Sequence, residues 1–248
     1  MSRKRVSLFS FLLVLLSMAS AQADTAVPAS VWAGSTAQLG VVINTGNTNS
    51  LNISYGTHIQ YQKNAWQNTL ELDAAVNRSL GVTTKQRYAL AEQLQYSLKS
   101  SINNFLYANL SVVDDRFSPY EYQMQGSLGY GRNLMRRNRL VWTAQLGPGM
   151  RYDNIKGTDK NSTSATLYMA SKIDWTLSDN INVVFSLKYT VGQLYNFINS
   201  MLALNNKITG HLALQASYSI QNYSKLPPAS AQSKKTDTIS NLALVYNF

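Results

Sequence analysis

The chain has 248 residues, a formal net charge of +10 and no cysteine, and only 14% of its residues are charged. A soluble globular domain carries about 25% charged residues, so this composition argues against a protein that dissolves freely in water. Without cysteine, neither a disulfide framework nor a lipoprotein anchor is expected.

Residues 1–23 have the features of a secretory signal peptide. A basic cluster at positions 3–5 precedes the apolar stretch Val6–Met18, and small residues follow up to Asp24. The apolar stretch is short for a membrane anchor, and Ala21-Gln22-Ala23 fits the cleavage rule, with cleavage after Ala21 as an alternative. We therefore predict that residues 24–248 are secreted.

The secreted part is interpreted as a short periplasmic segment, residues 24–31, followed by one domain, residues 32–248. The domain has no apolar run long enough for a helix to cross a bilayer. Its dominant pattern is instead the period-2 alternation of a β-strand with two different faces. One face of residues 50–62, for example, carries Leu51, Ile53, Tyr55, Ile59 and Tyr61.

Such segments recur along the whole domain, and the segment at 196–206 is the least regular. About twelve of them, each of roughly ten residues, match the repeat of membrane-spanning strands. The sequence thus predicts an all-β fold, a transmembrane antiparallel up-and-down β-barrel of about 12 strands. The predicted strands are residues 33–43, 50–62, 65–77, 86–98, 104–113, 120–132, 139–151, 164–177, 181–192, 196–206, 211–223 and 237–248.

Connection lengths predict the orientation of the barrel, because such barrels have short periplasmic turns and longer external loops. With the N-terminus in the periplasm, the short connections are periplasmic and the long ones external. The short ones are residues 62–64, 100–103, 177–180 and 206–210, and the long ones are residues 77–85, 114–119, 153–162 and 224–236.

Aromatic residues are predicted to form two belts at the lipid headgroups. The periplasmic belt comprises Tyr61, Trp66, Tyr96, Tyr130, Trp142, Trp175, Tyr246 and Phe248, and the external belt comprises Tyr88, Tyr120, Tyr122, Tyr189 and Tyr218.

The last eight residues, NLALVYNF, alternate perfectly and end on an aromatic side chain. We interpret them as the closing strand, which pairs with the strand near Gly34 to Ile43 because an open edge in hydrocarbon leaves backbone groups unsatisfied. Tyr246 and Phe248 also resemble the signal read by the barrel insertion machinery. A soluble β-sandwich is the alternative, but it does not explain the belts and the loop asymmetry.

Several short motifs resemble the YdiY-like family of salt-induced outer membrane proteins, whose domain has no assigned function. In chain order they are Trp32-x-Gly34, Leu39-Gly40, Thr45-Gly46-Asn47-Thr48, Asp115-Arg116-Phe117-Ser118, Tyr120-x-Tyr122, Gly147-Pro148-Gly149, Arg151-Tyr152, Pro227-Pro228, Thr236-Asp237-Thr238 and the terminal Phe248. The resemblance implies an outer-membrane barrel with no established chemistry and a link to salt through its expression.

Charged residues on the polar faces are the candidate functional groups, because these faces line the lumen. They are Glu71 and Asp73 on the third predicted strand, Arg151 on the seventh, Lys172 and Asp174 on the eighth, and Lys188 on the ninth. Acidic and basic groups on opposite walls predict a transverse field that tunes ion selectivity. The alternative is an ion network that fills the interior, since a barrel of about twelve strands lies between packed and open sizes.

Two residues break the pattern of their strands. Glu92 is in phase with lipid-facing residues, so we expect a β-bulge that shifts the register, or else a partner for the carboxylate. Pro148 removes a ladder donor and predicts a bend near the external rim, with a ligand contact as the alternative. Asp115, Arg116 and Phe117 are interpreted as an external salt-bridged turn or as a recognition site for a ligand.

Catalysis is not expected. A Ser-His-Asn arrangement can be drawn with His58 or His211 and Ser54 or Ser217, but the sequence has no GxSxG motif. Two separated histidines make no metal cluster, and no cofactor is predicted.

The basic charge is predicted to meet lipid rather than nucleic acid. Lys156, Lys160, Lys234 and Lys235 lie in loops, so the expected partners are outer-membrane lipid, lipopolysaccharide and, during biogenesis, the insertion machinery. The predicted function is structural or that of a narrow passive pore. A non-conducting surface or adhesion barrel is the main alternative, followed by a barrel hydrolase.

Overall fold

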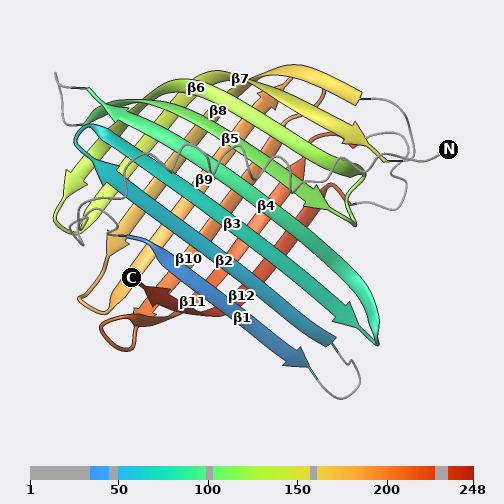
Figure 1. The fold of residues 1–248 in the computed structure, drawn as a ribbon, viewed down its shortest axis with the longest axis horizontal. Helices are drawn as coiled ribbons and strands as arrows, with labels where there is room; N and C mark the ends of the chain where they lie inside the picture. The colour runs from blue at the N-terminus through green and yellow to red at the C-terminus, as the bar shows by residue number, and fades with distance from the viewer. Residues whose placement is uncertain (1–33, 45–49, 99–102, 157–160, 227–233) are drawn as a thin grey trace, which may run out of the picture. The chain divides into compact units, whose positions relative to one another are not determined.

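The computed structural model describes residues 34–44, 50–98, 103–156, 161–226 and 234–248. Within them, twelve antiparallel strands pair with their sequence neighbours and close into a barrel (Figure 1). The predicted all-β barrel and its strand number are therefore confirmed. The strands are β1 Thr36–Asn44, β2 Ser50–Lys63, β3 Trp66–Ser79, β4 Val82–Ser97, β5 Asn104–Asp115, β6 Tyr120–Arg137, β7 Leu140–Ile155, β8 Asn161–Thr176, β9 Ile181–Gly192, β10 Phe197–Lys207, β11 Leu212–Tyr223 and β12 Thr236–Asn247.

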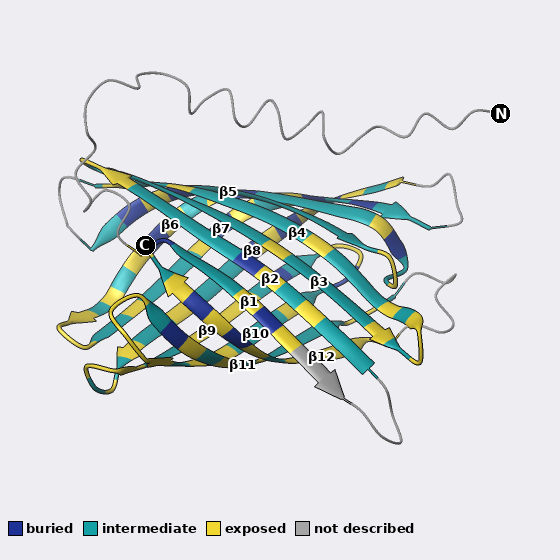
Figure 2. Ribbon diagram, turned by 60° about the horizontal axis from the view of Figure 1, so that its bottom comes forward, coloured by how far each residue is buried: buried dark blue, intermediate teal, exposed yellow. Residues whose placement is uncertain are grey.

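The period-2 alternation of the sequence becomes an inner and an outer face of the barrel. Leu39 on β1 is paired with Tyr55 on β2 and with Leu244 on β12, and all three side chains are exposed. Paired residues share a face, so these side chains form part of an apolar outer belt. Exposed residues alternate with less exposed ones along the strands (Figure 2).

The closing seam lies between β1 and β12, as predicted from the last eight residues. Its register runs from Thr36 opposite Asn247 to Leu39 opposite Leu244, and the Phe248 amide donates to the Ser35 carbonyl at 3.1 Å. A Cβ atom on Gly40 would lie 2.8 Å from the Leu242 carbonyl oxygen. Glycine at this position therefore permits the close approach of β12.

We call the end of the barrel that carries the C-terminus the Phe248 rim and the other end the distal rim. The prediction of a long connection at residues 77–85, at the distal rim, is wrong, because only Leu80 and Gly81 join β3 to β4. Both residues have positive φ, 50° and 79°, as a type I′ hairpin turn requires. The polar residues in this stretch end the alternation that is typical of lipid-facing strands. The two strands nevertheless extend through it, because their backbones pair with each other.

At the Phe248 rim, β4 ends at Ser97 and β5 begins at Asn104, so more residues separate these two strands than separate β3 from β4. The predicted alternation of short and long connections is thus not general. The chain segments 1–33, 45–49, 99–102, 157–160 and 227–233 lie outside the described residues. The proposed signal peptide and the segment 24–31 fall among them.

Three other predictions about strand irregularities need correction. The β3–β4 register shifts at Asn77/Arg78 but is continuous through Glu92. The expected bulge that would turn this carboxylate away from lipid is therefore absent from this strand pair. Pro148 lies in the middle of β7, opposite Leu167, rather than near a rim. A register shift between Tyr120 and Tyr122 turns Tyr120 toward the lumen, because a one-residue slip reverses the face. Tyr120 therefore does not belong to the aromatic belt.

Candidate functional site

The lumen holds a cavity of about 1190 Å³. Its wall is formed largely by polar side chains from most of the strands. Among the described residues, eight lysine and arginine side chains line it against five aspartate and glutamate residues. One of these five, Glu92, belongs to the outward face of β4 by its register. The wall is therefore positively charged overall.

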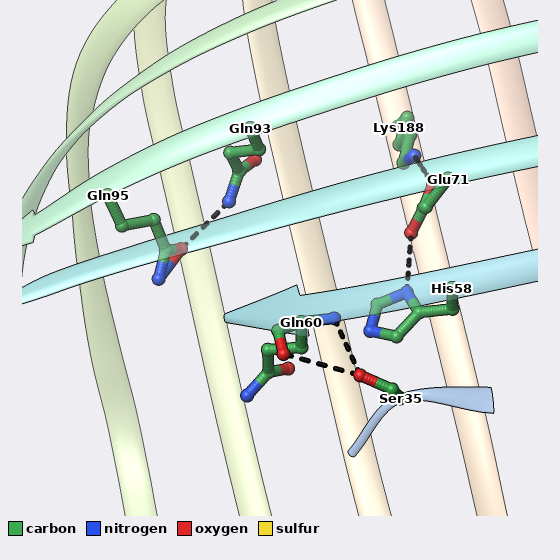
Figure 3. A network of polar contacts seen from close by, with 7 residues as sticks. All are labelled: Ser35, His58, Gln60, Glu71, Gln93, Gln95 and Lys188. Atoms are coloured by element: carbon green, nitrogen blue, oxygen red, sulfur yellow. Dashed lines mark hydrogen bonds and ion pairs between the residues drawn. The ribbon is translucent and has the colours of Figure 1, made fainter. Parts of the chain in front are cut away.

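Glu71 on β3 is held between two basic side chains in the middle of the barrel (Figure 3). Its Oε2 atom lies 4.0 Å from Lys188 Nζ, and its Oε1 atom lies 3.5 Å from His58 Nδ1. Five strands separate β3 from β9 on either side of the closed barrel, so the Glu71–Lys188 contact crosses the lumen. The acidic and basic side chains that were predicted on opposite walls are thus in contact with each other. Asp73 is the next residue on the inner face of β3.

The sequence-predicted network of Arg151, Lys172, Asp174 and Lys188 is divided in the structure. Asp174 accepts a hydrogen bond from Asn182 Nδ2 at 2.6 Å, and amide side chains extend this contact toward β11. Lys172 lines the cavity, whereas Lys188 contacts Glu71. No hydrogen bond or ion pair among the described residues therefore joins these four side chains into one network.

Arg151 belongs to a third arrangement, at the distal rim. Its Nη1 atom donates to the Tyr195 carbonyl at 3.3 Å, and its guanidinium lies 4.4 Å from the centre of the Tyr195 ring. Tyr195 stands in the short connection between β9 and β10 and is only 6% exposed. This connection is thus folded into the lumen rather than away from the barrel.

The Tyr195 hydroxyl is fixed by a buried carboxylate. It lies 2.9 Å from both carboxylate oxygens of Asp153, which is 1% exposed. Gln123 Nε2 donates to Asp153 Oδ1 and to the Tyr195 hydroxyl, both at 2.8 Å. Burial raises the pKa of Tyr195, nearby Arg151 opposes this and Asp153 adds to it. The phenol therefore stays protonated and donates to Asp153.

Two more tyrosines pack against Tyr195. The Tyr195 ring centre lies 6.0 Å from that of Tyr120 and 5.6 Å from that of Tyr223. Aromatic pairs at such ring distances are favourable beyond their buried area. We call the group formed by Tyr120, Gln123, Arg151, Asp153, Tyr195 and Tyr223 the Tyr195 plug.

Arg151 is the one residue of the Tyr195 plug that the sequence predicts as a lumen candidate. The sequence pattern instead places Asp153 in a long external connection and Tyr120 in the lipid-facing belt. The available signal was a tyrosine in the four-residue connection Gln193–Asn196, but this pattern does not show whether a connection folds inward.

A second aromatic contact narrows the lumen between β5 and β8. The rings of Tyr107 and Tyr168 lie 6.1 Å apart, and both side chains are buried with Phe105. A Cβ atom on Gly131 would overlap the Phe105 ring. The glycine on β6 therefore provides the space that Phe105 fills.

The motif Asp115, Arg116 and Phe117 forms a turn at the distal rim. Asp115 Oδ1 accepts from the Phe117 amide at 2.9 Å, and Arg116 Nη1 donates to Gln86 Oε1 at 3.4 Å. Lys156 Nζ donates to three carbonyl oxygens of the turn, those of Asp115, Arg116 and Ser118, at 2.7–2.8 Å. Burial lowers the pKa of Lys156, although Asp115 opposes this effect. In the described part of the chain, hydrogen bonds and Lys156 hold this turn, rather than an ion pair between Asp115 and Arg116.

The serine and histidine residues considered for catalysis contact other partners. Ser54 Oγ donates to Asn241 Oδ1 at 2.8 Å, while His58 contacts Glu71. His211 Nδ1 lies 3.1 Å from the Asn247 carbonyl oxygen. Each histidine therefore has a structural partner different from the proposed serine.

A closed antiparallel barrel with an apolar outer belt and a polar lumen defines the class of outer-membrane β-barrels. The solved structure of the NanC porin shares this fold, with 9% identity and a TM-score of 0.53 over 87% of this chain and 100% of that chain. An outer membrane channel from Pseudomonas putida F1 has 13% identity and a TM-score of 0.49 over 90% of this chain and 100% of that chain.

The chain belongs to the family described as "Protein of unknown function, DUF481", whose model matches residues 37–248. It is 27% identical over 209 residues to the uncharacterized protein YdiY of Escherichia coli K12, covering 84% of this chain and 80% of YdiY. The YdiY-like family membership predicted from the motifs is thus confirmed.

Proposed function

We propose that the protein is a narrow passive pore of the Gram-negative outer membrane that prefers anions and is restricted by the Tyr195 plug. The polar cavity of about 1190 Å³ with its excess of basic side chains carries this proposal. Rings of charge in a pore lining tune ion selectivity. The Glu71–Lys188 contact forms a second constriction in the middle of the pore.

The proposed orientation places the Phe248 rim in the periplasm and the Tyr195 plug toward the cell exterior. It rests on the interpretation of residues 1–23 as a cleaved signal peptide and on the even number of strands. Lipopolysaccharide then surrounds the distal rim, and the insertion machinery reads Tyr246 and Phe248. The link to salt or osmotic response follows from the family resemblance, and catalysis has no part in the proposal.

Single-channel recording of the refolded protein in a planar bilayer tests the proposal. We expect small discrete steps and a reversal potential that indicates anion preference in a salt gradient. Tyr195→Ala should enlarge or prolong the steps, whereas Tyr189→Ala, on the outer face of β9, should leave them unchanged. Silence of both the parent protein and Tyr195→Ala, with folding shown by heat-modifiable gel mobility, would contradict a pore.

A non-conducting surface barrel is the second candidate, and the contacts that cross the lumen favour it. The Tyr107–Tyr168 rings and the Glu71–Lys188 pair occupy the interior at separate places. If Tyr195→Ala and Lys188→Ala are each folded and give no conductance, the side chains of the interior close the lumen to ions. The distal turns would then be the parts to test for binding.

A further inference from the structure

A polar pair stands on the outer face of the barrel, where hydrocarbon is expected. Glu92 lies on β4 midway between the belt residues Tyr88 and Tyr96, and it is opposite Leu70 on β3 and Leu110 on β5. Asn68 Nδ2 donates to Glu92 Oε1 at 2.8 Å. The carboxylate therefore faces outward at the middle of the membrane-spanning part of β4.

One hydrogen bond leaves this carboxylate largely unsatisfied. An ionised carboxylate accepts about four hydrogen bonds, and among the described residues Asn68 provides one. Lipid tails offer no donor, and a charged side chain on the lipid face destabilises a barrel most strongly at the midplane. A protein surface that donates to Glu92 would remove this cost.

The pair is complementary to itself. Asn68 carries two N–H donors and Glu92 carries free acceptor positions, and the two residues are on adjacent strands. A two-fold axis near the pair brings Asn68 of one chain to Glu92 of another, so that each chain gives and receives a hydrogen bond. Interfaces of this isologous kind are the commonest among homo-oligomers, and this one needs no basic residue from a partner.

The surroundings of the pair suit close contact between two barrels. Leu90 and Leu94 flank Glu92 on the same face of β4, and Leu94 is exposed. Gly126 on β6 is opposite Leu110, and a Cβ atom there would meet nothing nearer than the Asn109 carbonyl oxygen at 3.7 Å. The face is therefore apolar around its polar centre, and Gly126 presents no side chain beside Leu110.

We infer that the outer face of β3–β5 centred on Asn68 and Glu92 is the interface of a homodimer within the membrane. The occupant is a second copy of this chain, held by two Asn68–Glu92 hydrogen bonds across the two-fold axis and by the leucines around them. This inference is independent of conduction, because the interface lies on the outside of the barrel.

Cysteine cross-linking in native outer membranes tests the interface, since the natural chain contains no cysteine. Leu90→Cys should give a disulfide-linked dimer on mild oxidation, because Leu90 lies beside the two-fold axis. Leu204→Cys is the matched control, since Leu204 faces outward on β10, on the other side of the barrel. Equal cross-linking of the two variants, or a product with the mass of a different partner, would overturn the proposal.

Removing the carboxylate tests the chemistry of the contact. Glu92→Leu in the Leu90→Cys background should lower the dimer fraction about tenfold. A polar contact within the membrane changes an association constant by about tenfold or less. Glu92→Gln should keep part of the dimer because an amide still accepts from Asn68. Glu92→Leu is compatible with a lipid-facing strand, and heat-modifiable mobility checks its folding. An unchanged dimer fraction in a folded Glu92→Leu protein contradicts the inference.

Discussion

The Tyr195 hydroxyl is 2.9 Å from both carboxylate oxygens of Asp153. This contact ties the connection between β9 and β10 to β7, which is a neighbour of β8 and not of β9. It therefore draws the connection over the lumen at the distal rim.

Removing that donor should open the plug. Tyr195→Phe keeps the ring contacts with Tyr120 and Tyr223 but leaves the buried Asp153 without the phenol. An unsatisfied buried acceptor costs about 1–3 kcal/mol, so the closed arrangement should weaken and the mean open time in bilayer recordings should rise. Tyr189→Phe on the lipid face is the control. Equal open times in parent and Tyr195→Phe channels would show that the hydroxyl does not hold the plug.

The plug should resist alkali up to the ordinary tyrosine range and then open. Burial raises the pKa of Tyr195 above its value in the unfolded chain. Its contribution to the closed state is therefore fully present below about pH 10 and is lost as the pH rises through the raised pKa. We expect constant conductance from pH 7 to about 10 and larger currents at higher pH. Tyr195→Phe should lack this alkaline step, and a step below pH 9 would contradict the assignment.

The Glu71–Lys188 contact should set selectivity at the middle of the pore. Lys188→Met removes a basic group from the constriction and should move the reversal potential in a salt gradient toward weaker anion preference. Glu71→Gln should move it in the opposite direction, because it leaves Lys188 without its carboxylate. Lys63→Met, at the Phe248 rim, is a control of equal charge change. Shifts of the same sign for Lys188→Met and Glu71→Gln would exclude a selectivity role for this pair.

Lys156 should stabilise the distal turn that carries Asp115, Arg116 and Phe117. Lys156→Met removes three hydrogen bonds from an ammonium to turn carbonyls, and bonds from a charged donor contribute about 1.5–3 kcal/mol each at most. We expect faster proteolysis within residues 116–119 and a lower unfolding midpoint in urea. Lys225→Met removes the same charge from a position near the distal rim and should change neither measurement. Identical cleavage rates for the two variants would assign the turn's stability to its own hydrogen bonds.

Glu92 shows why the register of a strand and the partner of a side chain are separate questions. The alternation of Tyr88, Leu90, Leu94 and Tyr96 placed residue 92 on the lipid face, and the continuous β3–β4 register agrees with that placement. A bulge was expected because a carboxylate in lipid is costly. The structure instead provides Asn68 from the neighbouring strand β3, where it lies on the same outer face, opposite Leu94.

The strand number, the faces of most strands and the closing of β12 on β1 were determined by the sequence itself. The physical reason is local: lipid on one side and water on the other impose alternation on each strand, and a closing strand such as the one ending at Phe248 must pair in hydrocarbon. Tertiary structure decided which residues meet across the lumen. Glu71 reaches Lys188, and Tyr195 reaches Asp153, only because barrel closure brings non-neighbouring strands together and one connection folds inward. Neither condition leaves a periodic signal in the chain.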